Sequence, residues 1–352
     1  MTSIFPIAKK HFLRKNCSPW VLNDFRIRSV RADGRVPAGR RVRVASRRSD
    51  TLLYGFGRGI MTLLYALPLG AAIGFSRWVA GLYYHFDRRH QRIADVNLSI
   101  AFPDMPPARR RQIARDSYRN LGEMLALIAH FPRLHDPERL SKLVRYDFTD
   151  EYVKFKAENR PVLILTAHLG CWELLSFAHG VFHRPIHYLY RPLDNPRIDA
   201  ALLRYRGLSG NQAISKRDAS RKVLRALASG ADVGILADQN VQEREGVFVD
   251  FFGKKACMTS GLALLALRSG AAVIPSFLVP DPERRTRYLI HALPSIPVRN
   301  TGNTAADVLE NTSRYARCIE EAVRQWPDRW LWGHRRWKTR PVDDPADPYA
   351  GI

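Results

Sequence analysis

The chain beyond residue 160 alternates short apolar stretches with segments of helix length. This alternation is typical of βαβ units and predicts an α/β fold, with a mainly parallel central sheet flanked by helices. The apolar stretches predict strands at 162–166, 186–190, 232–236, 273–279 and 288–292. The intervening segments predict helices at 172–182, 196–206, 219–229 and 259–268, and a last helix at 304–325.

A second apolar feature lies nearer the N-terminus. Residues 59–76 read GIMTLLYALPLGAAIGFS, a charge-free segment at the lower length limit for crossing a bilayer. Pro68 interrupts the segment, and Arg58 and Arg77 close its two ends. A spanning helix and an interfacial or re-entrant segment are therefore equally compatible with the pattern, and a buried core helix is a third reading.

The pattern divides the chain into four regions. Helical periodicity covers 93–100 and 107–131, separated by the breaker FPDMPP. We therefore predict a basic, poorly ordered extension at 1–50, a helical membrane-associated region at 51–150, an α/β core at 151–341 and a short tail at 342–352.

Charge adds information about partners. The formal net charge is +23, and residues 1–50 alone carry 13 basic and 3 acidic residues. Such a surface attracts nucleic acid, anionic lipid or acidic proteins. The first apolar segment lies too far from Met1 for a secretory signal. The cysteines are widely spaced and lack a C-x-x-C pair, which indicates neither a zinc site nor a disulfide framework: Cys17, Cys171, Cys257 and Cys318.

Polar side chains follow three of the predicted parallel strands. His168 and Glu173 follow 162–166, Arg191 follows 186–190, and Asp238 with Gln239 follows 232–236. Ligands of open parallel sheets bind outside the carboxyl ends of the strands. We therefore expect His168, Arg191 and Asp238 to lie on one rim of the sheet.

The spacing of His168 and Glu173 permits acid–base chemistry. A carboxylate bonded to one ring nitrogen fixes the imidazole tautomer, which leaves the other nitrogen free to accept a proton from a substrate hydroxyl. Glu173 could instead complement only the positive N-terminus of the following helix. The spacing alone leaves both readings open.

Several blocks of the sequence resemble one known family. They are NLSIAFPD from Asn97, TAHLGCWELL from Thr166, YRPLDNP from Tyr190, LADQN from Leu236, GVFVDFFG from Gly246 and WLWGHRRWKTRP from Trp330. In this order, they resemble the bacterial lipid A (lauroyl and myristoyl) acyltransferases of the lysophospholipid acyltransferase group, with an H-x4-[DE] block at His168. The resemblance covers roughly 52–341.

The resemblance implies transfer of a fatty acyl chain from acyl carrier protein to a hydroxyl of a lipid A precursor or related lipid. It implies His168 as general base, Glu173 as its partner, no covalent acyl-enzyme, no cofactor and no metal. Asp238 and Gln239 of the DQ block would orient the headgroup or a basic side chain. The protein would sit on the cytoplasmic face of the inner membrane, and action on another lysophospholipid or glycolipid is the alternative.

Two substrate-binding regions are expected beside this dyad. Arg191, together with Lys216 and Arg217, suits an anionic and phosphorylated acceptor headgroup. The apolar block containing Phe251, Phe252 and Gly253 could line an acyl groove, although apolar segments more often belong to the core.

Other classes of protein fit less well. A serine hydrolase is not indicated, because neither Ser209 nor Ser260 lies in a complete G-x-S-x-G. The spacing of His179, His183 and His187 does not match a zinc-binding H-E-x-x-H. A nucleic-acid binder would explain the charge but not the strand-exit residues, and no recognised binding motif is present. An inactive membrane scaffold remains an alternative.

Overall fold

The computed structural model describes residues 48–147, 149–215 and 219–352. Most of the predicted basic extension, and Lys216 and Arg217, therefore lie outside the described residues. The described residues belong to one compact unit.

A seven-stranded sheet forms the centre of this unit, with the strand order β1-β9-β8-β2-β5-β3-β4. Neighbouring strands are parallel except β8 and β9, which are antiparallel. The strands are β1 (Val144–Asp147), β2 (Val162–Thr166), β3 (Ile186–Tyr190), β4 (Gln212–Ser215), β5 (Asp232–Leu236), β8 (Ala272–Pro280) and β9 (Tyr288–Ala292). All five residues of the central strand β2 are buried, as its continuous apolar sequence requires of a strand covered on both faces.

The predicted mainly parallel α/β sheet is confirmed. Strands β2, β3, β5 and β9 have the predicted bounds, and β8 is one residue longer at each end. The edge strands β1 and β4 were not predicted, because each is four residues long and only partly buried. A separate antiparallel hairpin of β6 (Gly246–Phe251) and β7 (Lys254–Thr259) was also not predicted.

Helices cover both faces of the sheet. They are α1 (Arg48–Ala66), α2 (Leu69–Tyr83), α3 (Arg88–Ala101), α4 (Pro107–Leu134), α5 (Pro137–Ser141), α6 (Asp150–Ala157), α7 (Trp172–Phe182), α8 (Pro196–Gly207), α9 (Ala219–Ala228), α10 (Gly261–Ser269) and α11 (Thr304–Gln325), with 3-10 turns η1 (Glu243–Glu245) and η2 (Pro327–Arg329). Helices α9, α10 and α11 pack on the face that carries Leu163 and Val233, whereas α6 covers the face of Val162 and Ile164.

Local sequence explains several helix ends. Asn195 caps α8 by accepting hydrogen bonds from the backbone N–H groups of Arg197 and Ile198, and Pro196 occupies the first helical position. Helix α10 begins two residues later than predicted, because β7 extends through Thr259.

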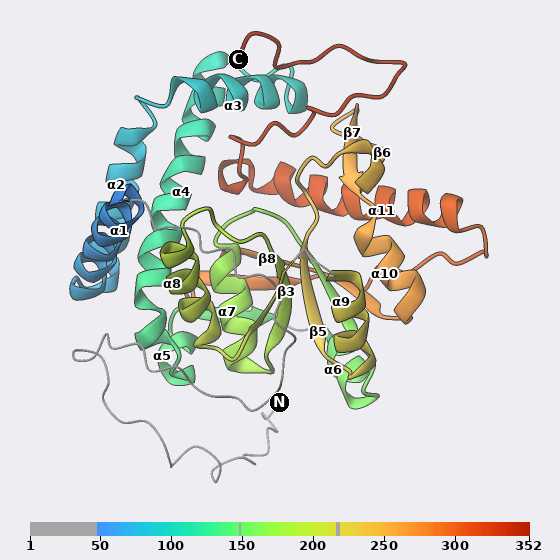
Figure 1. Cartoon of the computed structure of the whole chain (residues 1–352), viewed down its shortest axis with the longest axis horizontal. Helices are drawn as coiled ribbons and strands as arrows, with labels where there is room; N and C mark the ends of the chain where they lie inside the picture. Colours follow the sequence, from blue (N-terminus) through green and yellow to red (C-terminus); the bar gives the residue numbers. More distant parts are fainter. Residues whose placement is uncertain (1–47, 148, 216–218) are drawn as a thin grey trace. The chain divides into compact units, whose positions relative to one another are not determined.

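The apolar segment 59–76 belongs to two helices rather than one. Helix α1 ends at Ala66 and α2 begins after Pro68, which has no backbone N–H to continue the first helix. Figure 1 shows α1 and α2, in blue, lying beside the long helix α4. Among the described residues, no helix combines the length and the apolar character needed to cross a bilayer.

Helices α1 and α2 bury one side and expose the other. Leu64 and Ile73 are buried in a cluster with residues of α4 and α7. Large apolar side chains remain exposed from α1 to the turn after α2: Leu52, Leu53, Phe56, Leu63, Phe75, Trp78, Val79, Leu82, Tyr83 and Phe86. We call these ten residues the apolar surface. They lie on two neighbouring helices, whereas apolar side chains exposed singly are normal on a soluble domain.

Candidate active site

The carboxyl ends of β2, β5 and β3 meet at one rim of the sheet. These strands are adjacent and parallel, so His168, Asp238 and Arg191 all follow strand ends on the same side. The prediction that His168 and Asp238 share a rim is confirmed, because their side chains are in direct contact.

Asp238 holds His168 through two hydrogen bonds. The Nδ1–H of His168 donates to Oδ1 of Asp238 at 2.8 Å, and the backbone N–H of His168 donates to Oδ2 at 2.9 Å. The indole Nε1–H of Trp330 donates to the same Oδ2 at 2.7 Å. Burial raises the pKa of Asp238, but its interactions with His168 and Trp330 outweigh burial and lower the pKa to about 2. The group is therefore a carboxylate at neutral pH.

This contact fixes the tautomer of His168. A carboxylate can only accept hydrogen bonds, so the proton of the neutral ring must lie on Nδ1. The lone pair is then on Nε2, which lies 3.3 Å from the side-chain Nε2 of Gln239. The His168 side chain keeps 16% of its surface exposed. In this structure Nε2 accepts a hydrogen bond from the amide N–H of Gln239, so a bound hydroxyl must take the place of Gln239 before Nε2 can accept its proton.

Glu173 does not contact His168, and this part of the sequence prediction is corrected. Its two carboxylate oxygens accept hydrogen bonds from Nε and Nη2 of Arg206 on α8, at 2.8 and 2.5 Å. Glu173 is 8% exposed and lies in the first turn of α7. The nearer carboxylate in sequence therefore joins two helices, while Asp238, 70 positions away, orients the imidazole.

The loop between His168 and α7 is fixed by the C-terminal part of the chain. Gly170 has φ +63°, and a Cβ at this position would collide with the carbonyl oxygen of Leu278. The Gly170 N–H donates to the carbonyl of Arg329 at 2.9 Å, and the Leu331 N–H donates to the carbonyl of His168 at 3.0 Å. Glycine is required here by both the left-handed backbone and the close approach of β8.

The loop after β5 is also held by the C-terminal part of the chain. The backbone N–H of Asn240 donates to Nε2 of His334 at 3.0 Å, and the Asn240 side chain makes two 3.0 Å hydrogen bonds with Thr339. Burial lowers the pKa of His334 to about 4, so its ring is neutral and can accept this bond at neutral pH. These contacts position Asp238 and Gln239 beside His168.

The apolar residues predicted to line an acyl groove are buried. Phe251 and Phe252 are 1% and 6% exposed. Phe251 packs against Trp330, with ring centroids 5.8 Å apart, so the structure supports the core reading rather than the acyl groove. Gly253, with φ +73°, forms the turn between β6 and β7. Arg191 lies exposed just after β3.

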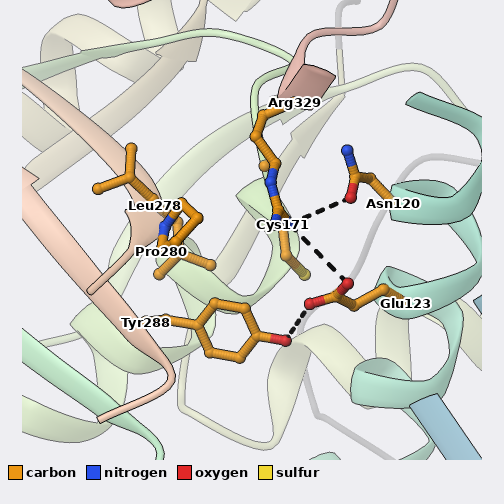
Figure 2. Close-up of a pocket in the computed structure, with 9 residues that line it drawn as sticks. Asn120, Glu123, Cys171, Leu278, Pro280, Tyr288 and Arg329 are labelled. Carbon is orange, nitrogen blue, oxygen red and sulfur yellow. Dashed lines mark hydrogen bonds and ion pairs between the residues drawn. The ribbon is translucent and has the colours of Figure 1, made fainter. Parts of the chain in front are cut away.

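Sequence reasoning missed a second polar cluster at the rim, shown in Figure 2. Glu123 of α4 accepts a hydrogen bond from the hydroxyl of Tyr288, and Asn120, one turn earlier, accepts one from Arg329 Nη1 at 3.1 Å. They line a cavity of about 10 Å³ together with Gly170 and neighbouring residues. These residues come from α4 and from the start of β9, so the strand-exit pattern gave no sign of them.

Comparisons with known proteins identify the family of this chain. The family model described as bacterial lipid A biosynthesis acyltransferase matches residues 44–339. The chain is 27% identical to a lipid A biosynthesis lauroyltransferase of Escherichia coli (strain K12), over 82% of this chain and 92% of the relative. It is 26% identical to a lipid A biosynthesis palmitoleoyltransferase of the same organism, over the same shares. A lipid A biosynthesis acyltransferase of Haemophilus influenzae is 27% identical over 83% of this chain and 91% of the relative.

Proposed function

Because the chain belongs to the bacterial lipid A biosynthesis acyltransferase family, we propose that it transfers a fatty acyl chain to a hydroxyl of a lipid A precursor. The observation that carries the mechanism is the contact between His168 and the buried carboxylate of Asp238 at the sheet rim. The sections of chain that hold this contact, 236–240 and 330–341, are two of the blocks on which the family resemblance rests.

His168 acts as general base in this proposal. Nε2 takes the proton of the acceptor hydroxyl as its oxygen attacks the carbonyl carbon of an acyl thioester. The resulting imidazolium donates Nδ1–H to Asp238, whose negative charge stabilises it. Collapse of the tetrahedral intermediate releases the thiolate, which takes up the proton from Nε2. The acyl chain moves directly to the acceptor, without a covalent acyl-enzyme.

Gln239 and Glu173 have supporting roles. The Gln239 amide lies beside Nε2 of His168, where it can bond the incoming acceptor oxygen. Glu173 fixes α7 against α8 through Arg206, and this pair keeps the start of α7 in place behind the His168 loop. Glu173 is therefore a positioning residue in this proposal and does not touch the reacting atoms.

The acyl donor is proposed to be acyl carrier protein and the site of action the cytoplasmic face of the inner membrane. The net charge of +23 supports docking of an acidic carrier and of anionic lipid. The apolar surface of α1 and α2, which includes exposed Trp78 and Tyr83, supports contact with the headgroup level of a bilayer. Two helices broken at Pro68 fit an interfacial position better than a span.

The experiment is acyl transfer by the full-length, detergent-extracted protein. Acyl carrier protein loaded with a C12 chain is the donor, a lipid A precursor is the acceptor, and mass spectrometry detects the product. We expect His168→Ala to lower the rate about 10² to 10⁴-fold. His135→Ala, at an exposed histidine beyond the end of α4, is the matched control and should retain full activity. A fully active His168→Ala protein would overturn the mechanism.

A further inference from the structure

Three arginines surround the single carboxylate of Glu123 at the rim. Arg77 of α2 forms an ion pair with Oε2, Arg329 Nη1 lies 3.8 Å from the same oxygen, and Arg287 Nη2 lies 3.7 Å from Oε1. Arg77 and Arg329 also donate to one oxygen of Asn120, at 3.2 and 3.1 Å. Two like charges therefore share one acceptor. We call Arg77, Arg287 and Arg329 the rim arginines.

The positive charge of this cluster exceeds its negative charge. Burial raises the pKa of Glu123, but the Tyr288 hydrogen bond and the rim arginines outweigh burial, so the pKa lies below its ordinary value and the group is charged. Asp328 adds a second carboxylate, 3.4 Å from Nε of Arg329. Three guanidinium groups thus face two carboxylates.

The rim arginines are accessible to a ligand. The side chains of Arg77, Arg287 and Arg329 are 28%, 46% and 21% exposed, whereas Glu123 is 5% exposed. Each guanidinium carries five N–H donors in a planar fork, which suits phosphate oxygens. The cavity of about 10 Å³ beside Glu123 is too small for a phosphate, so an anion must bind on the exposed side of the guanidinium groups.

The cluster lies next to the reactive loop. The backbone carbonyl of Arg329 accepts the N–H of Gly170, two residues after His168. Arg287 directly precedes β9, and β9 is antiparallel to β8, so Arg287 lies at the end of the sheet to which β2 delivers His168. An anion bound here would belong to the same substrate whose hydroxyl reaches His168.

The cluster also borders the apolar surface. Phe75, Trp78 and Val79, close to Arg77 along α2, are 42%, 64% and 42% exposed. A lipid whose chains contact this apolar surface would bring its phosphate to the level of Arg77. This arrangement favours a lipid headgroup over free phosphate as the source of the anion.

We propose that Arg77, Arg287 and Arg329 bind a phosphomonoester on the headgroup of the lipid acceptor and so place its hydroxyl near His168. The proposal rests on the proposed acyl transfer for the identity of the ligand as an acceptor. It assigns the anionic headgroup to a cluster on α2, β9 and η2, rather than to Arg191.

The test is equilibrium binding to the full chain by isothermal titration calorimetry, which does not depend on catalysis. The three probes are dihexanoyl phosphatidic acid, dihexanoyl glycerol and inorganic phosphate. The matched variants are Arg287→Gln and Arg299→Gln. Arg299 is 53% exposed and lies 3.9 Å from Asp307, a similar exposure and ion-pair length away from the rim.

We expect the phosphatidic acid to bind more tightly than the other two probes. Arg287→Gln should weaken its binding about tenfold, the value of one charged hydrogen bond, and Arg299→Gln should leave it unchanged. In acyl transfer, Arg287→Gln should raise the acceptor KM with little change in kcat. Glu123→Gln, where the protein folds, should tighten phosphatidic acid binding, because it removes a competing carboxylate.

Each contrary result has a distinct meaning. Equal binding of phosphatidic acid to wild type and Arg287→Gln would overturn the site. Inorganic phosphate binding as tightly as phosphatidic acid would overturn the lipid as its source. Wild-type binding that depends on Arg287, in a protein without acyl transfer, would instead overturn the proposed function and leave the phosphomonoester site standing.

Discussion

Asp238→Asn separates the role of the buried carboxylate from simple packing. The amide has nearly the same shape, so its oxygen can still accept from the backbone of His168 and from Trp330. Its NH2 group then faces Nδ1 of His168. Because an NH2 group can only donate, Nδ1 must become the acceptor and the ring proton moves to Nε2. The nitrogen that should take the substrate proton is then already protonated.

The expected loss follows from this tautomer change. A positioned base contributes about 10² to 10⁴ in rate, equivalent to about 3 to 5 kcal/mol at 1.36 kcal/mol for each factor of ten. The same substitution also removes the negative charge that stabilises the imidazolium. We therefore expect kcat to fall by about 10² to 10⁴, with a much smaller change in the KM for either substrate.

The assay combines acyl-transfer kinetics with thermal denaturation of the same detergent-extracted samples. Asp232→Asn is the control, because Asp232 is also buried and hydrogen bonded, to Tyr152 and Lys156, but begins β5 and so lies at the opposite end of that strand from Asp238. That variant should lose stability and keep its kcat. A folded Asp238→Asn protein within about threefold of the wild-type kcat would refute the orientation of His168 by Asp238.

Three further predictions test the surrounding structure. Glu173→Gln should lower the melting temperature, because it weakens the bidentate contact with Arg206. The kcat of the folded fraction should fall less than in Asp238→Asn. An equal fall in kcat in the two variants would restore Glu173 as the direct partner of His168. Gly170→Ala should reduce both stability and activity, since the added methyl meets Leu278 and the backbone is left-handed; wild-type melting would contradict this. The pKa of Asp238 is lower in the folded protein than in the unfolded chain, where it is about 4, so its ionisation stabilises the fold above pH 4. About 2 kcal/mol of the free energy of unfolding should be lost as the pH falls from 4 toward 2. In Asp238→Asn, the free energy of unfolding should not show this loss between pH 4 and pH 2. The same pH dependence in the variant and the wild type would contradict the lowered pKa of Asp238.

Much of the sheet could be predicted from sequence because its central strands are buried on both faces. The apolar segment of β2, the apolar residues of β5 and the N-cap of α8 are local signals, and they gave bounds close to those observed. The edge strand β4 carries little such signal, because two of its four residues are exposed. For the apolar residues of the β6–β7 hairpin, the sequence left an acyl groove and the core both open, since burial against Trp330 cannot be seen from an apolar segment alone.

The sequence predicted where the site lies, but not which carboxylate contacts His168. Strand order places His168 and Asp238 side by side, and both were identified at strand ends. Which carboxylate reaches the imidazole depends on the turn at Gly170 and on Arg206, 33 positions beyond Glu173, which binds that carboxylate instead. Sequence spacing shows neither the turn at Gly170 nor the contact between Arg206 and Glu173. The rim arginines come from three distant segments, so no local pattern could have joined them.

The hydrogen bonds from Trp330 and Leu331 to the two strand-exit loops have a consequence for biosynthesis. The strands that carry His168 and Asp238 leave the ribosome long before residues 330–341 are made, so a growing chain can complete its sheet while Asp238 still lacks the indole donor. The hydrogen bonds around His168 and Asp238 are therefore complete only after residues 330–341 have been made. A chain terminated after α11 would contain His168 and Asp238, but their two loops would lack the hydrogen bonds from Trp330 and Leu331.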